Sequence, residues 1–188
     1  MVDSLSRRVR SFLIQEDGAY LIEFALVLPV LILLSFGLLE FSLVTFEYQR
    51  ITEATRRGAR RAIVQVATIP NTATLLAGAK IVCTGYGVNS IGCVGASVNV
   101  DAQTNFALLL AEMQEIFPPI RASNVVLTYE ATDLGNPGDK GGIFPMVTIQ
   151  LIGVKHDMLV GPVLGVSSIT LPDFKTTILG NGRSVNAG

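Results

Sequence analysis

A run of sixteen residues without a charged side chain, Phe24 to Leu39, most constrains how this chain folds. The wider segment from Ala19 to Phe46 has 28 residues and only two charges, Glu23 and Glu40. A helix needs about 20 residues to cross a hydrocarbon core about 30 Å thick. The run therefore predicts one membrane-spanning helix near the N-terminus of a 188-residue chain.

A secretory signal peptide is the first alternative, because Arg7, Arg8 and Arg10 precede the apolar run. A signal peptide has an apolar core of roughly 7–15 residues, followed by a small-residue cleavage site. Here the core is longer, and the small residues Gly18 and Ala19 come before it. This order favours a helix that stays in the membrane.

Basic residues flank the span on both sides, so charge bias alone does not fix its orientation. The leader arginines favour a cytoplasmic N-terminus. Five more arginines follow the span closely: Arg50, Arg56, Arg57, Arg60 and Arg61. The net charge of −1 gives no overall field that would attract nucleic acid, so we expect no nucleic-acid partner.

The helix is expected to continue to about residue 66 with one face of small and apolar side chains. That face comprises Ile51, Ala54, Thr55, Gly58, Ala59, Ala62, Ile63 and Val66. Within it, Ala54, Gly58 and Ala62 repeat every four residues, which predicts close packing on a flat surface. We expect the arginines on the other faces to be solvated or to contact lipid headgroups, with Glu53 paired to Arg57.

The rest of the chain reads as alternating strands and one helix, which indicates an α+β domain with an antiparallel sheet. The expected strands are 79–84, 93–100, 124–131, 144–154 and 168–179, and the expected helix is 104–117. The expected divisions are a leader at 1–18, a transmembrane helix at 19–46, its amphipathic continuation at 47–69 and the domain at 70–188.

Cys83 and Cys93 close the glycine-rich segment "CTGYGVNSIGC". A disulfide is expected if this part of the chain lies outside the cytoplasm. The alternative is two free, buried thiols. A structural metal site is not expected, because no second pair of cysteine or histidine completes a tetrahedral ligand set.

Reactive side chains are too few to predict an enzyme, a metal site or a cofactor. His156 is the only histidine, and its neighbour Asp157 would point to the opposite face of a strand. A calcium loop is a second possibility, with Asp133, Asn136 and Asp139 as ligands, but the spacing fits an ordinary hairpin loop better.

The stretch "DGAYLIEFALVLPVLILLSFGLLEF", continued by "ITEATRRGARRA", resembles the N-terminal region of type IV pilin-like proteins. It is most similar to the TadE-like pseudopilins, or minor pilins, of tight-adherence (Tad, or Flp) pili. The resemblance covers residues 15–65. It implies a leader removed after Gly18 by a prepilin peptidase, Ala19 as the new N-terminus and Glu23 as the fifth mature residue.

Cleavage would give Glu23 a partner, because the new α-amino group at Ala19 is charged at neutral pH. The carboxylate lies one helical turn from that amine, or near the amine of a neighbouring subunit. The alternative is that Glu23 sits at the headgroup level and needs no partner. For Glu40, at the other end of the span, we expect a solvated interfacial carboxylate.

The resemblance implies a type IV pilin-like fold, a cytoplasmic N-terminus, an inner-membrane span and a periplasmic domain. The implied function is a minor pilin or assembly component in pilus biogenesis and adhesion, including a place in the extracellular pilus. The implied partners are the prepilin peptidase, the major pilin, a sister pseudopilin and the inner-membrane assembly platform. The alternatives are an unprocessed, signal-anchored periplasmic binding or adaptor domain, and a membrane-tethered hydrolase built around His156.

Overall fold

A computed structural model of the chain describes residues 16–64, 80–87, 90–95, 100–132, 134 and 144–180. These residues belong to two compact units. One contains the long helix as far as Val44 together with Met158–Ser167, and the other contains the remaining described residues.

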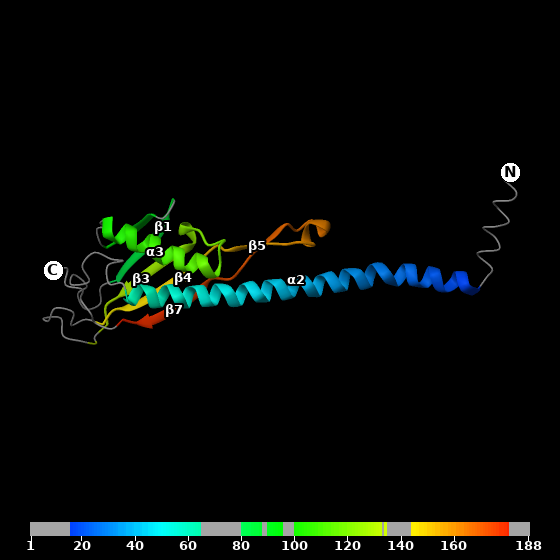
Figure 1. The fold of residues 1–188 in the computed structure, drawn as a ribbon, viewed down its shortest axis with the longest axis horizontal. Helices are drawn as coiled ribbons and strands as arrows, with labels where there is room; N and C mark the ends of the chain where they lie inside the picture. The colour runs from blue at the N-terminus through cyan, green and yellow to red at the C-terminus, as the bar shows by residue number, and fades with distance from the viewer. Residues whose placement is uncertain are drawn as a thin grey trace. The chain divides into compact units, whose positions relative to one another are not determined.

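The long helix α2 runs from Glu16 to Val64 without a break and includes Pro29. Figure 1 shows it as one continuous helix, coloured from blue to cyan. It begins three residues before the predicted start, so the Gly18–Ala19 peptide bond lies in its first turn. Its 49 residues correspond to about 73 Å at 1.5 Å per residue.

The apolar part of α2 leaves its large side chains uncovered. Tyr20, Leu26 and Leu38 are each at least 70% exposed, and the most apolar 18-residue window has a mean hydropathy of 2.5 with none of its residues buried. Among the described residues, this is the one helix long and apolar enough to cross a membrane. The hydroxyls of Ser35 and Ser42 donate to backbone carbonyls within the same helix, each at 2.8 Å.

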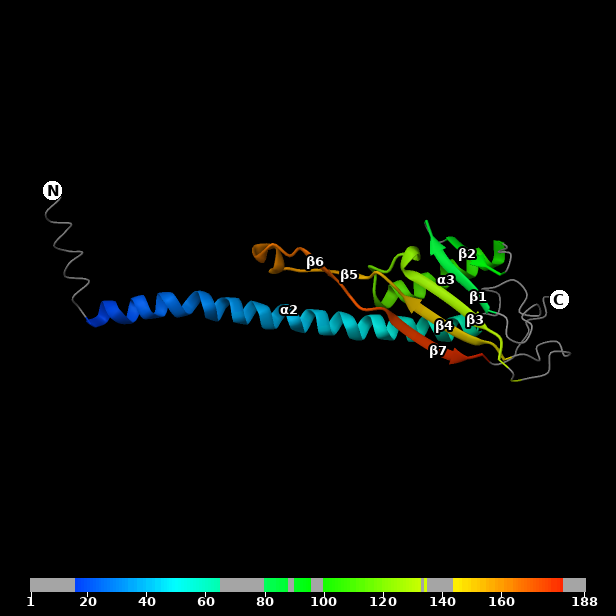
Figure 2. The same ribbon diagram turned by 180° about the vertical axis from the view of Figure 1, so that it is seen from behind.

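The second unit contains an antiparallel sheet of five strands in the order β2-β1-β3-β4-β7. The strands are β1 Lys80–Tyr86, β2 Ser90–Val94, β3 Val125–Glu130, β4 Met146–Leu151 and β7 Phe174–Leu179. Figure 2 shows β1, β3, β4 and β7 side by side. An antiparallel sheet domain after a long apolar helix confirms the predicted α+β class.

Helix α3, Val100–Ile116, and the second half of α2 cover the same face of this sheet. One row of paired residues crosses all five strands on that face: Cys93, Cys83, Leu127, Ile149 and Thr176. Gly85, two residues beyond Cys83, lies near Phe106 of α3, and Ile149 lies near Gly58 of α2. The core is therefore a single layer between two helices and one sheet face.

Three predicted element boundaries were wrong. The predicted strand at 93–100 ends at Val94, and Val100 already begins α3. The predicted strand at 144–154 is divided into β4 and the short β5, Lys155–Asp157, because Gly153 adopts a positive φ of 62° between them.

The predicted strand at 168–179 is likewise two strands, β6 Ser168–Thr170 and β7. Pro172 lies between them and lacks the N–H that a continuous ladder would use. β5 and β6 pair with each other in a separate two-stranded sheet. The remaining elements are two short 3₁₀ helices, η3 Ala122–Asn124 and η4 Gly161–Leu164.

Candidate functional site in the long helix

The predicted processing residues all lie in the first turns of α2. Gly18 is buried and Ala19 is exposed, and both have helical backbone. Glu23 is exposed and lines a shallow hollow of about 270 Å³ with Tyr20, Phe24 and Val27. The chain described here includes residues 1–18, so the pairing of Glu23 with an amine at Ala19 stays a prediction.

The three small residues predicted to pack closely are buried in the domain of the same chain. Ala54 is 0% exposed and Ala62 is 3% exposed. A Cβ built on Gly58 would lie 2.7 Å from Sδ of Met113 and 3.1 Å from Cδ1 of Ile149. The small face therefore accommodates α3 and β4, which leaves it unavailable as a contact between subunits.

Several arginines predicted to be solvated or to meet headgroups instead bind α3. Arg50 donates to the carbonyl of Ile116, at the C-terminal end of α3, and its guanidinium lies 5.8 Å from the ring of Phe117. Arg61 forms an ion pair with Glu112.

The predicted pairing of Arg57 with Glu53 is also wrong. The guanidinium of Arg57 instead lies 3.4 Å from a carboxylate oxygen of Glu115. Both side chains are well exposed, so this pair adds little stability. Arg56 and Arg60 are exposed, as predicted.

Cys83 and Cys93 lie directly opposite each other in the β1–β2 ladder and are joined by a disulfide. Their Cα atoms are 4.0 Å apart. Cys83 is fully buried. The disulfide fixes the edge strand β2 to the sheet.

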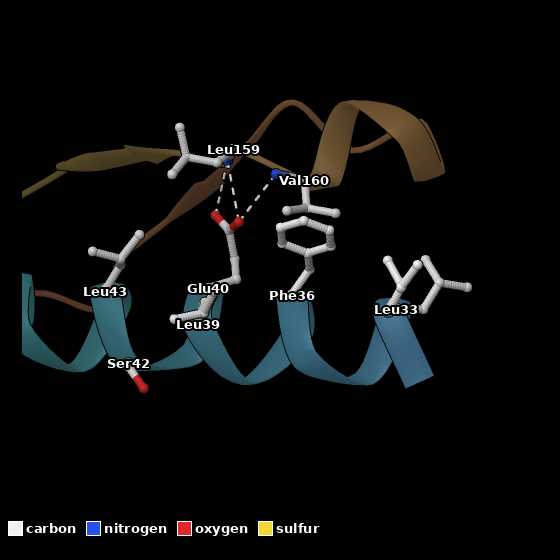
Figure 3. Close-up of a pocket in the computed structure, with 9 residues that line it drawn as sticks. Leu33, Phe36, Leu39, Glu40, Ser42, Leu43, Leu159 and Val160 are labelled. Carbon is white, nitrogen blue, oxygen red and sulfur yellow. Dashed lines mark hydrogen bonds between the residues drawn. The ribbon is translucent and has the colours of Figure 1, made fainter. Parts of the chain in front are cut away.

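The prediction that Glu40 is a solvated carboxylate was wrong, because this residue is only 6% exposed. Its carboxylate accepts hydrogen bonds from the backbone N–H of Leu159, at 2.9 and 3.2 Å, and from that of Val160, at 3.1 Å (Figure 3). Backbone donors thus stabilise a carboxylate that would be costly to bury alone.

Glu47 and His156 form a second carboxylate contact that the sequence pattern did not indicate. Nδ1 of His156 lies 2.8 Å from Oε2 of Glu47, and His156 is 4% exposed in the centre of β5. As expected, its neighbour Asp157 points to the opposite, exposed side. A histidine buried against a structural helix is positioned to hold β5, with little access for a substrate.

Candidate metal ligands are sparse in the described ranges, which hold no cluster of three or more His, Cys, Asp or Glu side chains suited to a metal ion. The loop predicted around Asp133, Asn136 and Asp139 lies outside the described residues.

Residues 18–60 match the model of the TadE-like protein family. The matched segment begins at Gly18, runs along α2 through the apolar region and ends in the arginine-rich turn at Arg60. It confirms the resemblance stated from the sequence. No curated protein and no solved structure matches the chain.

Proposed function

Because residues 18–60 carry the TadE-like segment, we propose that this chain is a minor pilin, or pseudopilin, of a tight-adherence pilus. The family match associates it with that pilus system and with a membrane. The observation that carries the finer proposal is the position of the match, which starts at Gly18 and contains Glu23 four residues after Ala19.

In this proposal a prepilin peptidase removes residues 1–18 and leaves Ala19 as a charged N-terminus. The exposed apolar side chains of α2 then hold the chain in the inner membrane and pack against other subunits. Expected partners besides the peptidase are the major pilin, a sister pseudopilin and the assembly platform. Their assembly gives the chain its role in pilus biogenesis and adhesion, and the role is structural, without catalysis.

The Cys83–Cys93 disulfide supports a periplasmic place for the domain. Disulfides persist in the bacterial periplasm and are rare in the cytoplasm. This compartment agrees with the orientation favoured by Arg7, Arg8 and Arg10, which precede the span.

The first test is the mass of the mature N-terminus in cells that contain the cognate peptidase. We expect a chain beginning at Ala19. We expect Gly18→Val to retain residues 1–18, because a branched side chain would occupy the position before the scissile bond. Gly37→Val is the matched control, since a Cβ at Gly37 meets nothing within 4 Å in the same helix. This control should be cut normally.

An intact N-terminus in the wild-type chain would overturn the processing step. It would favour the second candidate, an unprocessed membrane-anchored adaptor domain. One observation favours that candidate: the Gly18–Ala19 bond is helical, whereas a peptidase needs an accessible, extended bond. The first turn of a helix frays readily, because its N–H groups have no partners within the helix, so processing requires only local opening.

A further inference from the structure

The segment between β5 and β6 has an uncharged, apolar composition suited to contact with lipid, although the strand before it, β5, carries charged residues. No charged residue occurs from Met158 to Pro172. Leu159 is 74% exposed and Val166 is 46% exposed, so apolar side chains face outward. Single exposed apolar residues are common, but a charge-free turn that exposes several of them indicates a contact surface.

Five backbone N–H groups of this segment donate hydrogen bonds within the turn or to Glu40. Three internal bonds close the turn: Met158 N–H to Ser167 at 3.0 Å, Val166 N–H to Gly161 at 2.9 Å and Gly165 N–H to Pro162 at 3.2 Å. Glu40 accepts from the next two N–H groups, those of Leu159 and Val160. In lipid each unsatisfied backbone group costs several kcal/mol, so this pairing lowers the cost of leaving water.

The same segment lies against the apolar part of α2 in one compact unit. Leu159 and Val160 border an open groove of about 740 Å³ whose other walls come from α2. Those walls are Ile32, Leu33, Phe36, Leu39, Glu40, Ser42 and Leu43. Figure 3 shows Phe36, Glu40 and Leu43 on the side of the helix that faces the segment.

Glu40 immediately follows the sixteen-residue run Phe24–Leu39 that has no charge. A bilayer crossed by that run has Glu40 near the boundary between hydrocarbon and headgroups on the far side. Phe36 and Leu33, which line the groove, lie one and two turns deeper.

We propose that Met158–Ser167 is a second membrane contact of this chain, which inserts its apolar turn into the outer leaflet beside α2. Lipid acyl chains fill the groove, and Glu40 holds the turn at that depth through the N–H groups of Leu159 and Val160. The inference rests on the membrane placement of α2 in the proposed function. It does not depend on cleavage or on assembly into a pilus.

Two properties of the turn favour lipid over a protein partner: its apolar surface is continuous with that of α2, and it has no charged side chain. The apolar surface of the turn continues the lipid-facing surface of α2 at Phe36 and Leu39. The turn presents no charged side chain with which a protein partner could fix a specific orientation.

The chain contains no tryptophan, so a single introduced tryptophan reports on one place. The full chain is reconstituted in phosphatidylcholine vesicles, and fluorescence is compared with and without bromine on the acyl chains. We expect strong quenching for Leu159→Trp and for Leu31→Trp in the span. Val94→Trp, at a side chain 80% exposed on β2, is the matched control and should be unquenched.

The two variants separate the two proposals. Quenching at position 31 without quenching at position 159 overturns the second membrane contact and leaves the span intact. Absence of quenching at both positions overturns the membrane placement itself. A blue-shifted, unquenched Leu159→Trp whose emission depends on protein concentration assigns the turn to a second copy, which also overturns the proposal.

The role of Glu40 is tested by adding Glu40→Gln to each tryptophan variant. The amide retains one acceptor oxygen and loses the charge, so we expect quenching at position 159 to fall at least twofold while quenching at position 31 is unchanged. Equal quenching at position 159 with and without the substitution would overturn the anchoring role of Glu40.

Discussion

Gly85 carries a packing constraint near the end of β1, next to the edge strand of the sheet. A Cβ at this position would lie 2.1 Å from the backbone carbonyl oxygen of Ala122 and 2.8 Å from the ring of Phe106. The glycine therefore allows η3 to approach β1 more closely than any other residue would. Three glycines lie between Cys83 and Cys93 in the sequence, and of these Gly85 is a buried residue of β1.

Gly85→Ala should destabilise the domain by about 1–3 kcal/mol, because a backbone carbonyl must move to admit the methyl group. Gly92→Ala on the adjacent strand is the matched control. Its Cβ would meet only the ring of Tyr86, which is 55% exposed and free to shift. Chemical unfolding of the full chain in detergent, followed by circular dichroism, measures both, and equal midpoints would contradict this account of Gly85.

Glu40 and Glu47 mark the limit of what the sequence shows at the scale of the residue. Their partners are 119 residues away at Leu159 and 109 residues away at His156. A pattern of spacings within one helix carries no information about contacts so distant, so Glu40 reads as an interfacial charge. The uncharged segment after Asp157 was the available signal, although by itself it does not identify an acceptor on α2.

At the scale of the element, the disulfide is the main constraint on the edge of the sheet. β2 is a five-residue strand with β1 as its one neighbour in the sheet. Gln103 of α3 adds two contacts to it, since its side chain accepts from the N–H of Ile91 at 2.8 Å and donates to the Ile91 carbonyl at 2.9 Å. The disulfide and α3 together hold β2 in the sheet, because a strand of five residues with one neighbour is too short to be stable alone.

Replacing Cys83 and Cys93 together by alanine should lower the free energy of unfolding by about 2–3 kcal/mol. The estimate follows from loop closure, because the two residues are ten positions apart. Chemical unfolding of the full chain under non-reducing conditions measures the loss. The wild-type chain treated with a reductant should show the same loss, and no change in either case would contradict a structural role for the cross-link.

Elements with a strong local signal were predictable, and the breaks between them were less so. α2 and β3 agree with the predicted segments to within a few residues because their periodicities are long or clean. The single breaks at Gly153 and Pro172 were missed, since apolar residues continue on both sides. The sequence predicted that Ala54, Gly58 and Ala62 pack closely on a flat surface. Only the fold identifies that surface as α3 and β4.

For the whole molecule, the fold class could be predicted from the sequence because one segment is strongly apolar and the remainder alternates between expected strands and one expected helix.

The proposed assembly role is also tested at the scale of the whole molecule. Glu23→Gln should insert into the membrane and be processed normally, yet reduce piliation at least tenfold, because the neutral amide cannot offset the charge of the Ala19 amine. Cells are scored for pili and for surface adhesion.

Glu53→Gln is the matched control, since it neutralises an exposed glutamate on the same helix beyond the span. It should leave piliation unchanged. Full piliation of cells carrying Glu23→Gln would contradict the role assigned to the fifth mature residue.

The sheet order has a consequence for biosynthesis. Among the described strands β7 comes last in the chain, and it lies beside β4, where its Thr176 hydroxyl donates to the Thr55 hydroxyl of α2 at 3.0 Å. The small face of α2 is synthesised before α3, β4 and β7, so it stays incompletely covered until all three of these elements have formed. The domain can therefore close only after β7 has been made, and until then the uncovered apolar face of α2 is open to aggregation.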